Sequence, residues 1–304
     1  MFYLRVLAAV AVFGALSVAG VLGVLFSRDR ERMAVTYTGW VGRWVPPLLR
    51  LRVRVTGRER LTAHRPCVFI GNHQSALDVP VLANCFTPGS VAIGKKEIAA
   101  VPVFGWLFDA TGQIRIDRGD REQAVGRLKE AEEAIRVRRV GVWILPEGTR
   151  GREPGVMLPF KKGAFLMAIH TGAPLVPIVT SPLRPRSDLR ARRLQPNDVE
   201  VRVLEPIPTD GLTDADLPWL MAQARHRMYA ALADMSRERG VEPPPEALEA
   251  PAAAQRPPGA SSSGFGGGTQ ASSTTTGGGR SPNPSEGGGS SSSSAPSSGG
   301  GGGS

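Results

Sequence analysis

Short apolar runs alternate with helix-like segments along residues 67–204, and this alternation limits the fold more than any other feature of the sequence. Apolar residues recur at helical spacing in 121–139 and 161–172, and a further amphipathic helix is predicted at 215–238. Strands that alternate with helices indicate an α/β domain built on a parallel or mixed sheet. The predicted strands are 67–71, 90–94, 112–116, 140–145, 174–180 and 199–204.

Polar residues gather where three of these strands end. In α/β sheets, reactive groups collect in the loops at the carboxyl ends of the strands.

The first cluster, "GNHQSALD", contains His73 and Asp78. Residues five apart on one helix point about 140° away from each other, so a turn must separate these two if they interact. Pro80 fits the first turn of the helix that would follow. A carboxylate bonded to one ring nitrogen leaves the other free to accept a proton. Taken alone, the string is better explained by a structural loop histidine, or by Asp78 acting only as a helix cap.

The second and third clusters are rich in arginine. "GQIRIDRGDR" places Asp117, Arg118 and Arg121 at a strand exit, where a guanidinium suits a phosphate monoester. A solvated turn with Asp120 as the N-cap of the next helix is the alternative. "ILPEGTRG" ends a buried strand with a glycine, hydrogen-bond donors and a cation that could bind phosphate. An ordinary surface turn is its alternative.

The two ends of the chain differ from this domain. Residues 6–26 carry no charge and would form a helix roughly 30 Å long, enough to cross a bilayer. A cleaved signal peptide is the rival, but the run is long and basic residues follow it at once. The tail is rich in Pro, Gly and Ser and has few large apolar residues to bury. We therefore predict a membrane anchor at 1–32, one α/β domain at 33–240 and a disordered tail at 241–304.

The net charge and two further segments predict what the protein contacts. The formal net charge of +10 favours anionic lipid headgroups, and no recognised nucleic-acid-binding motif accompanies it. Segment 38–55 mixes tryptophans and arginines, which suits either the membrane interface or an amphipathic element ending in a strand. Segment 98–110 is predicted to be a core helix, with an acyl-chain tunnel or interfacial segment as the alternative.

The clusters together resemble the 1-acylglycerol-3-phosphate acyltransferases (lysophosphatidic acid acyltransferases) of the glycerolipid acyltransferase superfamily. "NHQSALD", "GQIRIDR", "LPEGTR" and "APLVPIV" look like four family blocks, in the family's order and spacing. "KKEI…VPVFGW" and "LPFKKGAF" are similar to its connecting segments. The resemblance covers about residues 50–185. The sequence departs from the family pattern at Arg115, Leu145 and Gly151.

The resemblance implies an α/β acyltransferase fold and a role for each matching residue. His73 would be the general base and Asp78 would orient it, while Arg118 and Lys96 would hold the phosphate of the acceptor. The remaining predicted acceptor contacts are Glu147, Gly148, Thr149 and Arg150. The implied reaction moves an acyl chain from acyl-CoA or acyl-carrier protein to lysophosphatidic acid, giving phosphatidic acid, with no metal and no cofactor. The implied location is a membrane, with a single N-terminal anchor and the catalytic domain on the cytoplasmic side.

Three alternatives remain at this point. A related acyltransferase would use glycerol-3-phosphate or another lysolipid as acceptor. A metal-dependent phosphohydrolase could be built from His73, Asp78, Asp117 and Glu147, although these lack recognised ligand spacing and stand beside competing arginines. A membrane-binding module without catalytic activity would need no more than the basic charge and the anchor.

Overall fold

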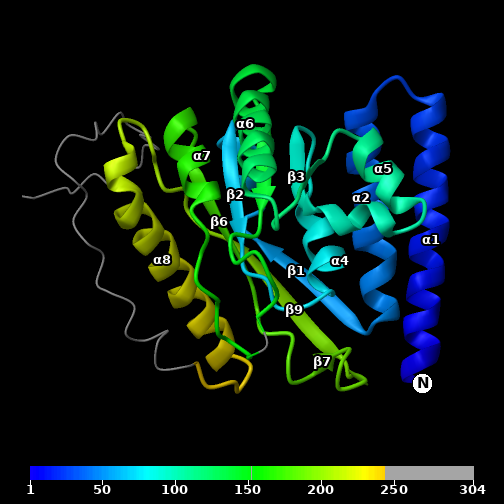
Figure 1. Ribbon diagram of the computed structural model, residues 1–304. Helices are drawn as coiled ribbons and strands as arrows, with labels where there is room; N and C mark the ends of the chain where they lie inside the picture. Colours follow the sequence, from blue (N-terminus) through cyan, green and yellow to red (C-terminus); the bar gives the residue numbers. More distant parts are fainter. Residues whose placement is uncertain (152, 244–304) are drawn as a thin grey trace, which may run out of the picture. The chain divides into compact units, whose positions relative to one another are not determined.

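The computed structural model describes residues 1–151 and 153–243 (Figure 1). Apart from residues 241–243, the predicted tail lies outside the described residues. Within them, a seven-stranded sheet has the order β1-β9-β6-β2-β5-β3-β4. Five neighbouring strands, from β6 to β4, run parallel, whereas β9 is antiparallel to β6 and β1 is parallel to β9. In sheet order the strands are Leu51–Thr56, Asn197–Val203, Leu175–Thr180, Cys67–Gly71, Gly141–Ile144, Ser90–Lys95 and Ile114–Ile116.

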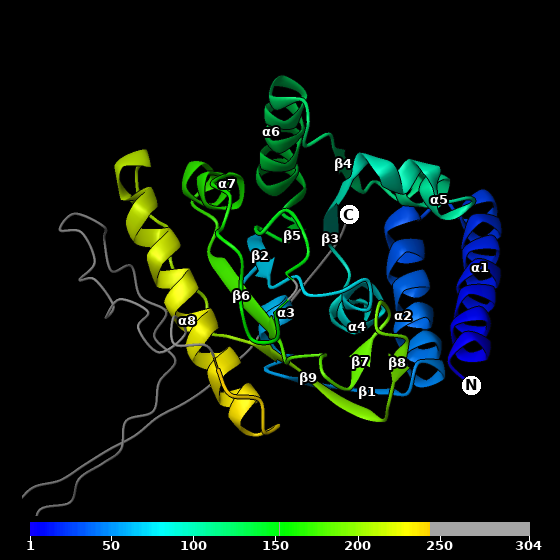
Figure 2. The same cartoon turned by 60° about the horizontal axis from the view of Figure 1, so that its bottom comes forward.

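Helices cover both faces of the sheet, as Figures 1 and 2 show. On one face lie α6 (Arg121–Arg138), α7 (Gly163–Thr171) and α8 (Leu217–Arg237). On the other lie α1 (Phe2–Phe26), α2 (Arg30–Leu48), α3 (Arg60–Ala63), α4 (Asp78–Leu82) and α5 (Phe104–Ala110). Short 3₁₀ turns occupy Ala83–Cys85, Lys96–Ala100 and Asp214–Asp216.

Strand β2 lies at the centre of both cores because its side chains alternate between the two faces of the sheet. Val68 and Ile70 join the cluster under α6–α8, whereas Cys67 and Phe69 join the cluster on the opposite face. Every residue of β2 is buried. This explains why the strand reads as a continuous apolar run in the sequence.

The mixed α/β sheet predicted from the sequence is confirmed. All six predicted strands are present, and segment 38–55 forms the end of α2 followed by β1, as its amphipathic interpretation predicted. Asp120 accepts a hydrogen bond from the Gln123 amide (3.0 Å) and caps α6. The sequence did not indicate a small two-stranded hairpin, β7 (Ser187–Asp188) and β8 (Arg193–Leu194).

The N-terminal apolar run forms α1, a 25-residue helix of sufficient length and apolar composition to cross a membrane. It packs against α2 and α5, and α5 buries Leu107 and Phe108 as the core-helix prediction required. Val101, Val103 and Trp106 of the same segment are exposed. Large apolar side chains of α1 are also exposed, among them Tyr3, Leu4, Leu7, Val10, Val18, Leu22, Leu25 and Phe26.

Candidate active site

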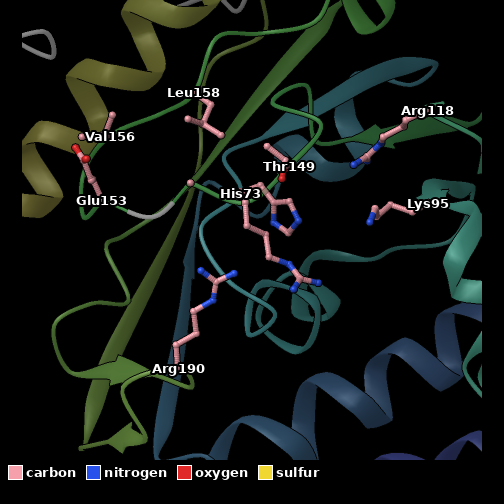
Figure 3. A pocket seen from close by; sticks show the side chains of 10 residues that line it. His73, Lys95, Arg118, Thr149, Glu153, Val156, Leu158 and Arg190 are labelled. Atoms are coloured by element: carbon pink, nitrogen blue, oxygen red, sulfur yellow. The ribbon is translucent and has the colours of Figure 1, made fainter. Parts of the chain in front are cut away.

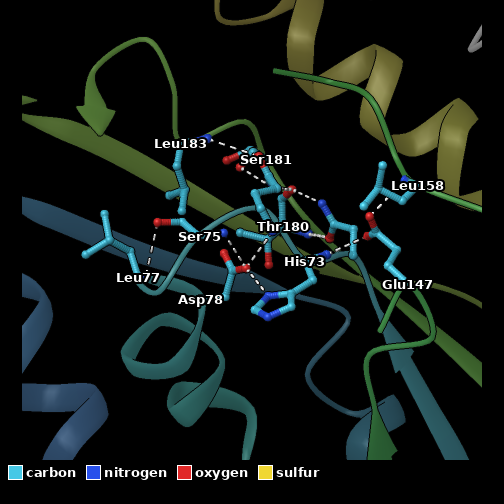
Figure 4. A network of polar contacts seen from close by, with 11 residues as sticks. His73, Ser75, Leu77, Asp78, Glu147, Leu158, Thr180, Ser181 and Leu183 are labelled. Carbon is cyan, nitrogen blue, oxygen red and sulfur yellow. Dashed lines mark hydrogen bonds and ion pairs between the residues drawn. The ribbon is translucent and has the colours of Figure 1, made fainter. Parts of the chain in front are cut away.

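His73 lies in the loop that follows β2, and Asp78 is the first residue of α4, so a turn separates them as the spacing required. The Nδ1 atom of His73 is 2.7 Å from Oδ2 of Asp78 (Figure 4). The same Oδ2 accepts hydrogen bonds from the backbone amides of Gln74 (2.7 Å) and Ser75 (2.9 Å). The Asp78 side chain is 1% exposed. The carboxylate therefore organises the whole turn as well as the imidazole.

The tautomer of His73 follows from this arrangement. An ionised carboxylate has no proton to donate, so Nδ1 of His73 must donate to Asp78. The neutral ring then carries its free lone pair on Nε2, which can accept a proton from a substrate. The imidazole lines a cleft, where such a substrate could reach it (Figure 3).

The backbone of His73 is held on both sides by the loop that follows β5. Its amide donates to Oε1 of Glu147 (2.6 Å), and its carbonyl accepts from the amide of Gly151 (2.8 Å). Both oxygens of Glu147 are occupied, because Oε2 accepts from the amide of Leu158 (2.8 Å). The backbone of His73 is thus held by a peptide group and one buried carboxylate, whereas Asp78 holds its ring.

The neighbours of His73 attach the loop to the end of β6. Asn72 exchanges two hydrogen bonds with the backbone of Thr180, at 2.9 and 2.8 Å. Gln74 donates to the carbonyls of Thr180 (2.9 Å) and Ser181 (3.2 Å), and its side-chain oxygen accepts from the amide of Leu183 (3.3 Å). Figure 4 shows Thr180, Ser181 and Leu183, the β6 end of this network, beside His73. The loop is therefore connected to the strands on both sides of β2.

The cleft in front of His73 has a volume of about 610 Å³ and an excess of positive charge (Figure 3). Four of its lining residues are cations and one is acidic, the latter being Glu153. Such a cleft favours an anionic ligand. The lining residues are His73, Lys95, Arg118, Thr149, Arg150, Gly151, Glu153, Val156, Leu158 and Arg190.

A family model described as Acyltransferase matches residues 52–181. The 1-acyl-sn-glycerol-3-phosphate acyltransferase of Escherichia coli (strain K12) is 33% identical over 221 residues, which are 73% of this chain and 89% of the E. coli chain. This chain belongs to the 1-acyl-sn-glycerol-3-phosphate acyltransferase family. The Saccharomyces cerevisiae enzyme of that name is 34% identical over 206 residues, covering 66% of this chain and 68% of its own. The crystal structure of the Thermotoga maritima 1-acyl-sn-glycerophosphate acyltransferase shares the fold, with a TM-score of 0.62 at 22% identity, over 78% of this chain and 98% of that one.

The acyltransferase brings most of the predicted site residues together, but not all of them face the cleft. Thr149 and Arg150 line it with His73 and Arg118. Gly148 adopts a left-handed conformation (φ 69°), which residues with a side chain rarely adopt. Its carbonyl accepts a hydrogen bond from Arg118, so Gly148 positions that guanidinium through its backbone.

Glu147 and Lys96 are not among the residues that line the cleft. Burial raises the pKa of the Glu147 carboxyl to about 7, against the opposing effect of the amides of His73 and Leu158. Glu147 is 3% exposed, so its carboxylate supports the loop from the protein interior. The Nζ atom of Lys96 is paired with Oδ2 of Asp117 at 2.6 Å, while Lys95 lines the cleft instead. Contacts from Glu147 and Lys96 to the acceptor stay predictions that this geometry does not favour.

Sequence reasoning missed two of the cleft cations, Lys95 and Arg190. Lys95 is the last residue of β3 and the immediate neighbour of the predicted Lys96, so only the strand register distinguishes them. Arg190 lies beyond the four sequence blocks in an arginine-rich segment, and nothing in the sequence singles it out. Among residues 1–151 and 153–243, no group of three or more His, Cys, Asp and Glu side chains is arranged to hold a metal ion.

Proposed function

We propose that this acyltransferase moves an acyl chain from acyl-CoA or acyl-carrier protein to the free sn-2 hydroxyl of 1-acylglycerol-3-phosphate, giving phosphatidic acid. The observation that carries the proposal is His73, with Nδ1 bonded to Asp78 and its ring lining a cationic cleft. The names of the E. coli and S. cerevisiae relatives support the choice of acceptor. A phosphate monoester fits a cleft lined by Lys95, Arg118 and Arg150.

The reaction needs one base and no covalent enzyme intermediate. Nε2 of His73 takes the proton of the acceptor hydroxyl while the oxygen attacks the thioester carbonyl carbon. The new carbon–oxygen ester bond forms, the carbon–sulfur bond breaks, and the departing thiolate takes the proton back from His73. Asp78 stabilises the imidazolium that exists between these two proton transfers. We propose that these residues carry out the transfer without a metal or other cofactor.

The deciding experiment supplies purified enzyme in detergent–lipid micelles with labelled acyl-CoA and one of two acceptors, lysophosphatidic acid or glycerol-3-phosphate. Acyl-carrier protein replaces acyl-CoA in a second series. We expect labelled phosphatidic acid from lysophosphatidic acid, and chelator in the buffer should not change the rate. Acylation of glycerol-3-phosphate in place of lysophosphatidic acid would contradict the proposed acceptor.

We further propose that α1 anchors the enzyme in the membrane, with the catalytic domain on the cytoplasmic side. The exposed apolar side chains of α1 support the anchor, and Arg28, Arg30 and Arg32 directly after it support the orientation. The wild-type chain should stay with membranes after alkaline carbonate washing, and a protease added outside intact cells should not cut the domain. Release by carbonate would contradict an embedded α1.

The neighbouring lysines give a test of the acceptor-binding side of the cleft. Lys95→Ala should raise the KM for lysophosphatidic acid about tenfold, because a cation that lines the cleft is lost. Lys96→Ala removes the same charge one residue away, from a side chain that is paired with Asp117, and should change that KM by no more than about twofold. Initial-rate measurements at saturating acyl donor give both values. A larger rise in this KM for Lys96→Ala than for Lys95→Ala would instead assign the acceptor contact to Lys96.

A further inference from the structure

Arg190 is a cleft cation that the family blocks do not contain. It lies in the turn of the hairpin between β7 and β8, beyond residue 181, where the match to the family model ends. Its side chain nevertheless lines the same cleft as His73 and extends from the hairpin toward it (Figure 3). A residue outside the matched region therefore contributes to the surface that a substrate meets.

The turn holds the backbone of Arg190 and leaves its guanidinium available. Oδ1 of Asp188 accepts from the amides of Arg190 (2.9 Å) and Ala191 (3.3 Å). Oδ2 of Asp188 pairs with Arg184 at 3.0 Å. Within residues 1–151 and 153–243, no hydrogen bond or ion pair engages the guanidinium of Arg190. The side chain is exposed, so it can bind an anion without first breaking an internal contact.

The cleft cations come from elements on opposite sides of β2, the strand that leads to His73. Arg150, Lys95 and Arg118 follow or end β5, β3 and β4, which lie in that order on one side of β2. The hairpin that carries Arg190 follows β6, the neighbour of β2 on the other side. In Figure 3, His73 accordingly lies between Arg190 and the pair Lys95 and Arg118. An anion next to His73 can therefore be contacted from two directions.

The spacing between reacting group and phosphate differs between the two substrates, and this difference identifies the anion that would lie in the cleft beside His73. In lysophosphatidic acid, about four bonds, roughly 5 Å, separate the reacting hydroxyl from the phosphorus. In acyl-CoA and acyl-carrier protein, the pantetheine arm places the nearest phosphate on the order of 15 Å from the sulfur when extended. The phosphate of the acceptor is thus the one that lies close to a hydroxyl held at Nε2 of His73, within the cleft that Arg190 also lines.

We infer that Arg190 binds the acceptor phosphate opposite Arg118 and Lys95, and so makes the enzyme selective for phosphate monoesters over phosphodiester lysolipids. The inference rests on the proposed function. A monoester offers three unsubstituted oxygens and nearly two negative charges, which suit cations on several sides. A phosphodiester replaces one of those oxygens with a headgroup substituent. With Arg118 and Lys95 on one side, a substituent on the opposite oxygen would displace Arg190 from the phosphate.

The test compares Arg190→Ala with Arg186→Ala. Arg186 is an exposed arginine at the base of the same hairpin that does not line the cleft, so it controls for the loss of one positive charge. We expect Arg190→Ala to raise the KM for lysophosphatidic acid about tenfold and to change kcat and the KM for acyl-CoA by no more than about twofold. Arg190→Lys should recover part of the loss, and Arg186→Ala should resemble wild type.

Selectivity is measured with lysophosphatidylethanolamine, a phosphodiester, as a competitor of lysophosphatidic acid. Its inhibition constant should stay the same or fall in Arg190→Ala while the KM for lysophosphatidic acid rises. Equal losses for both lipids, a raised KM for acyl-CoA instead, or no difference from Arg186→Ala would each overturn the inference. The activity of the wild-type enzyme distinguishes a failure of the proposed function from a failure of this inference. If it does not acylate lysophosphatidic acid, the proposed function fails, whereas active wild type with an unaffected Arg190→Ala removes this inference alone.

Discussion

His73→Ala is expected to lower kcat about a thousandfold and leave the fold unchanged. The rate falls because no other group takes the proton of the acceptor hydroxyl, a contribution of about 10²–10⁴ for a positioned general base. The fold persists because the two hydrogen bonds that hold residue 73, with Glu147 and Gly151, use its backbone amide and carbonyl. Asp78 also keeps the amides of Gln74 and Ser75 as donors. Initial rates and thermal unfolding in detergent measure the two effects separately.

Asp78→Asn provides the matched variant for this prediction. Asparagine has the same size but presents one acceptor oxygen and one donor group, so the tautomer of His73 is no longer fixed. We expect a fall in kcat comparable to that of His73→Ala, and little further loss when both substitutions are combined. Full activity in His73→Ala, or additive losses in the double variant, would contradict a joint action of the two residues.

Glu147→Ala should destabilise the enzyme by about 2–4 kcal/mol, because two buried amides, those of His73 and Leu158, lose their acceptor. The same change frees the backbone of His73, so we also expect kcat to fall at least about tenfold. Glu147→Gln keeps the volume and one carbonyl oxygen, and it should lose roughly half as much stability. A normal melting temperature for Glu147→Ala combined with a raised acceptor KM would instead assign Glu147 to acceptor binding.

The pH dependence of stability gives a separate test of Glu147. Burial raises the pKa of this carboxyl from 4.5 to about 7 in the folded enzyme, so between these values the folded state holds a proton that the unfolded state has lost. The unfolded state binds fewer protons, and the contribution of this group to stability therefore declines as pH rises from 4.5 to 7. Wild type should lose stability relative to Glu147→Gln over that interval. A constant difference between the two melting temperatures would contradict the raised pKa.

A histidine, His170, is expected to show a pH dependence of the same sign. His170 lies between Glu132 (3.1 Å) and Asp214 (3.0 Å), which together raise the pKa of its imidazole despite partial desolvation. A raised histidine pKa stabilises the fold below the unfolded value, and this contribution is lost as pH rises through the folded one. His170→Gln should therefore reduce the melting temperature more at pH 5.5 than at pH 8.5. A larger reduction at the higher pH would exclude this charge pairing.

The sequence predicts the parts of the site that depend on local pattern. The strand before His73, the turn required between His73 and Asp78, and the helix after Asp120 all follow from spacing and capping preferences. Residues at strand exits fall close together because a parallel sheet brings its carboxyl ends to one edge. For the same reason, Arg118, Thr149 and Arg150 reach the cleft that His73 lines.

Other parts depend on contacts between distant segments, which no local pattern reports. Lys95 and Lys96 have the same chemistry, and the end of β3 decides which of them lines the cleft. Glu147 looks like a ligand in sequence because glutamate is seldom buried, yet its two oxygens meet amides from residues 73 and 158. Arg190 enters through a hairpin of two-residue strands, too short for an alternating pattern to be visible.

The attachment of His73 through peptide groups also bears on how this enzyme could diverge. Its amide, its carbonyl and its ring are held by Glu147, Gly151 and Asp78, whose bonds to it do not involve the cleft cations. Mutations at Lys95, Arg118 or Arg190 can therefore alter which lipid is accepted while the proton-transfer geometry is inherited intact. Acceptor preference and chemical competence are encoded by separate residues, so selection can change the first without first losing the second.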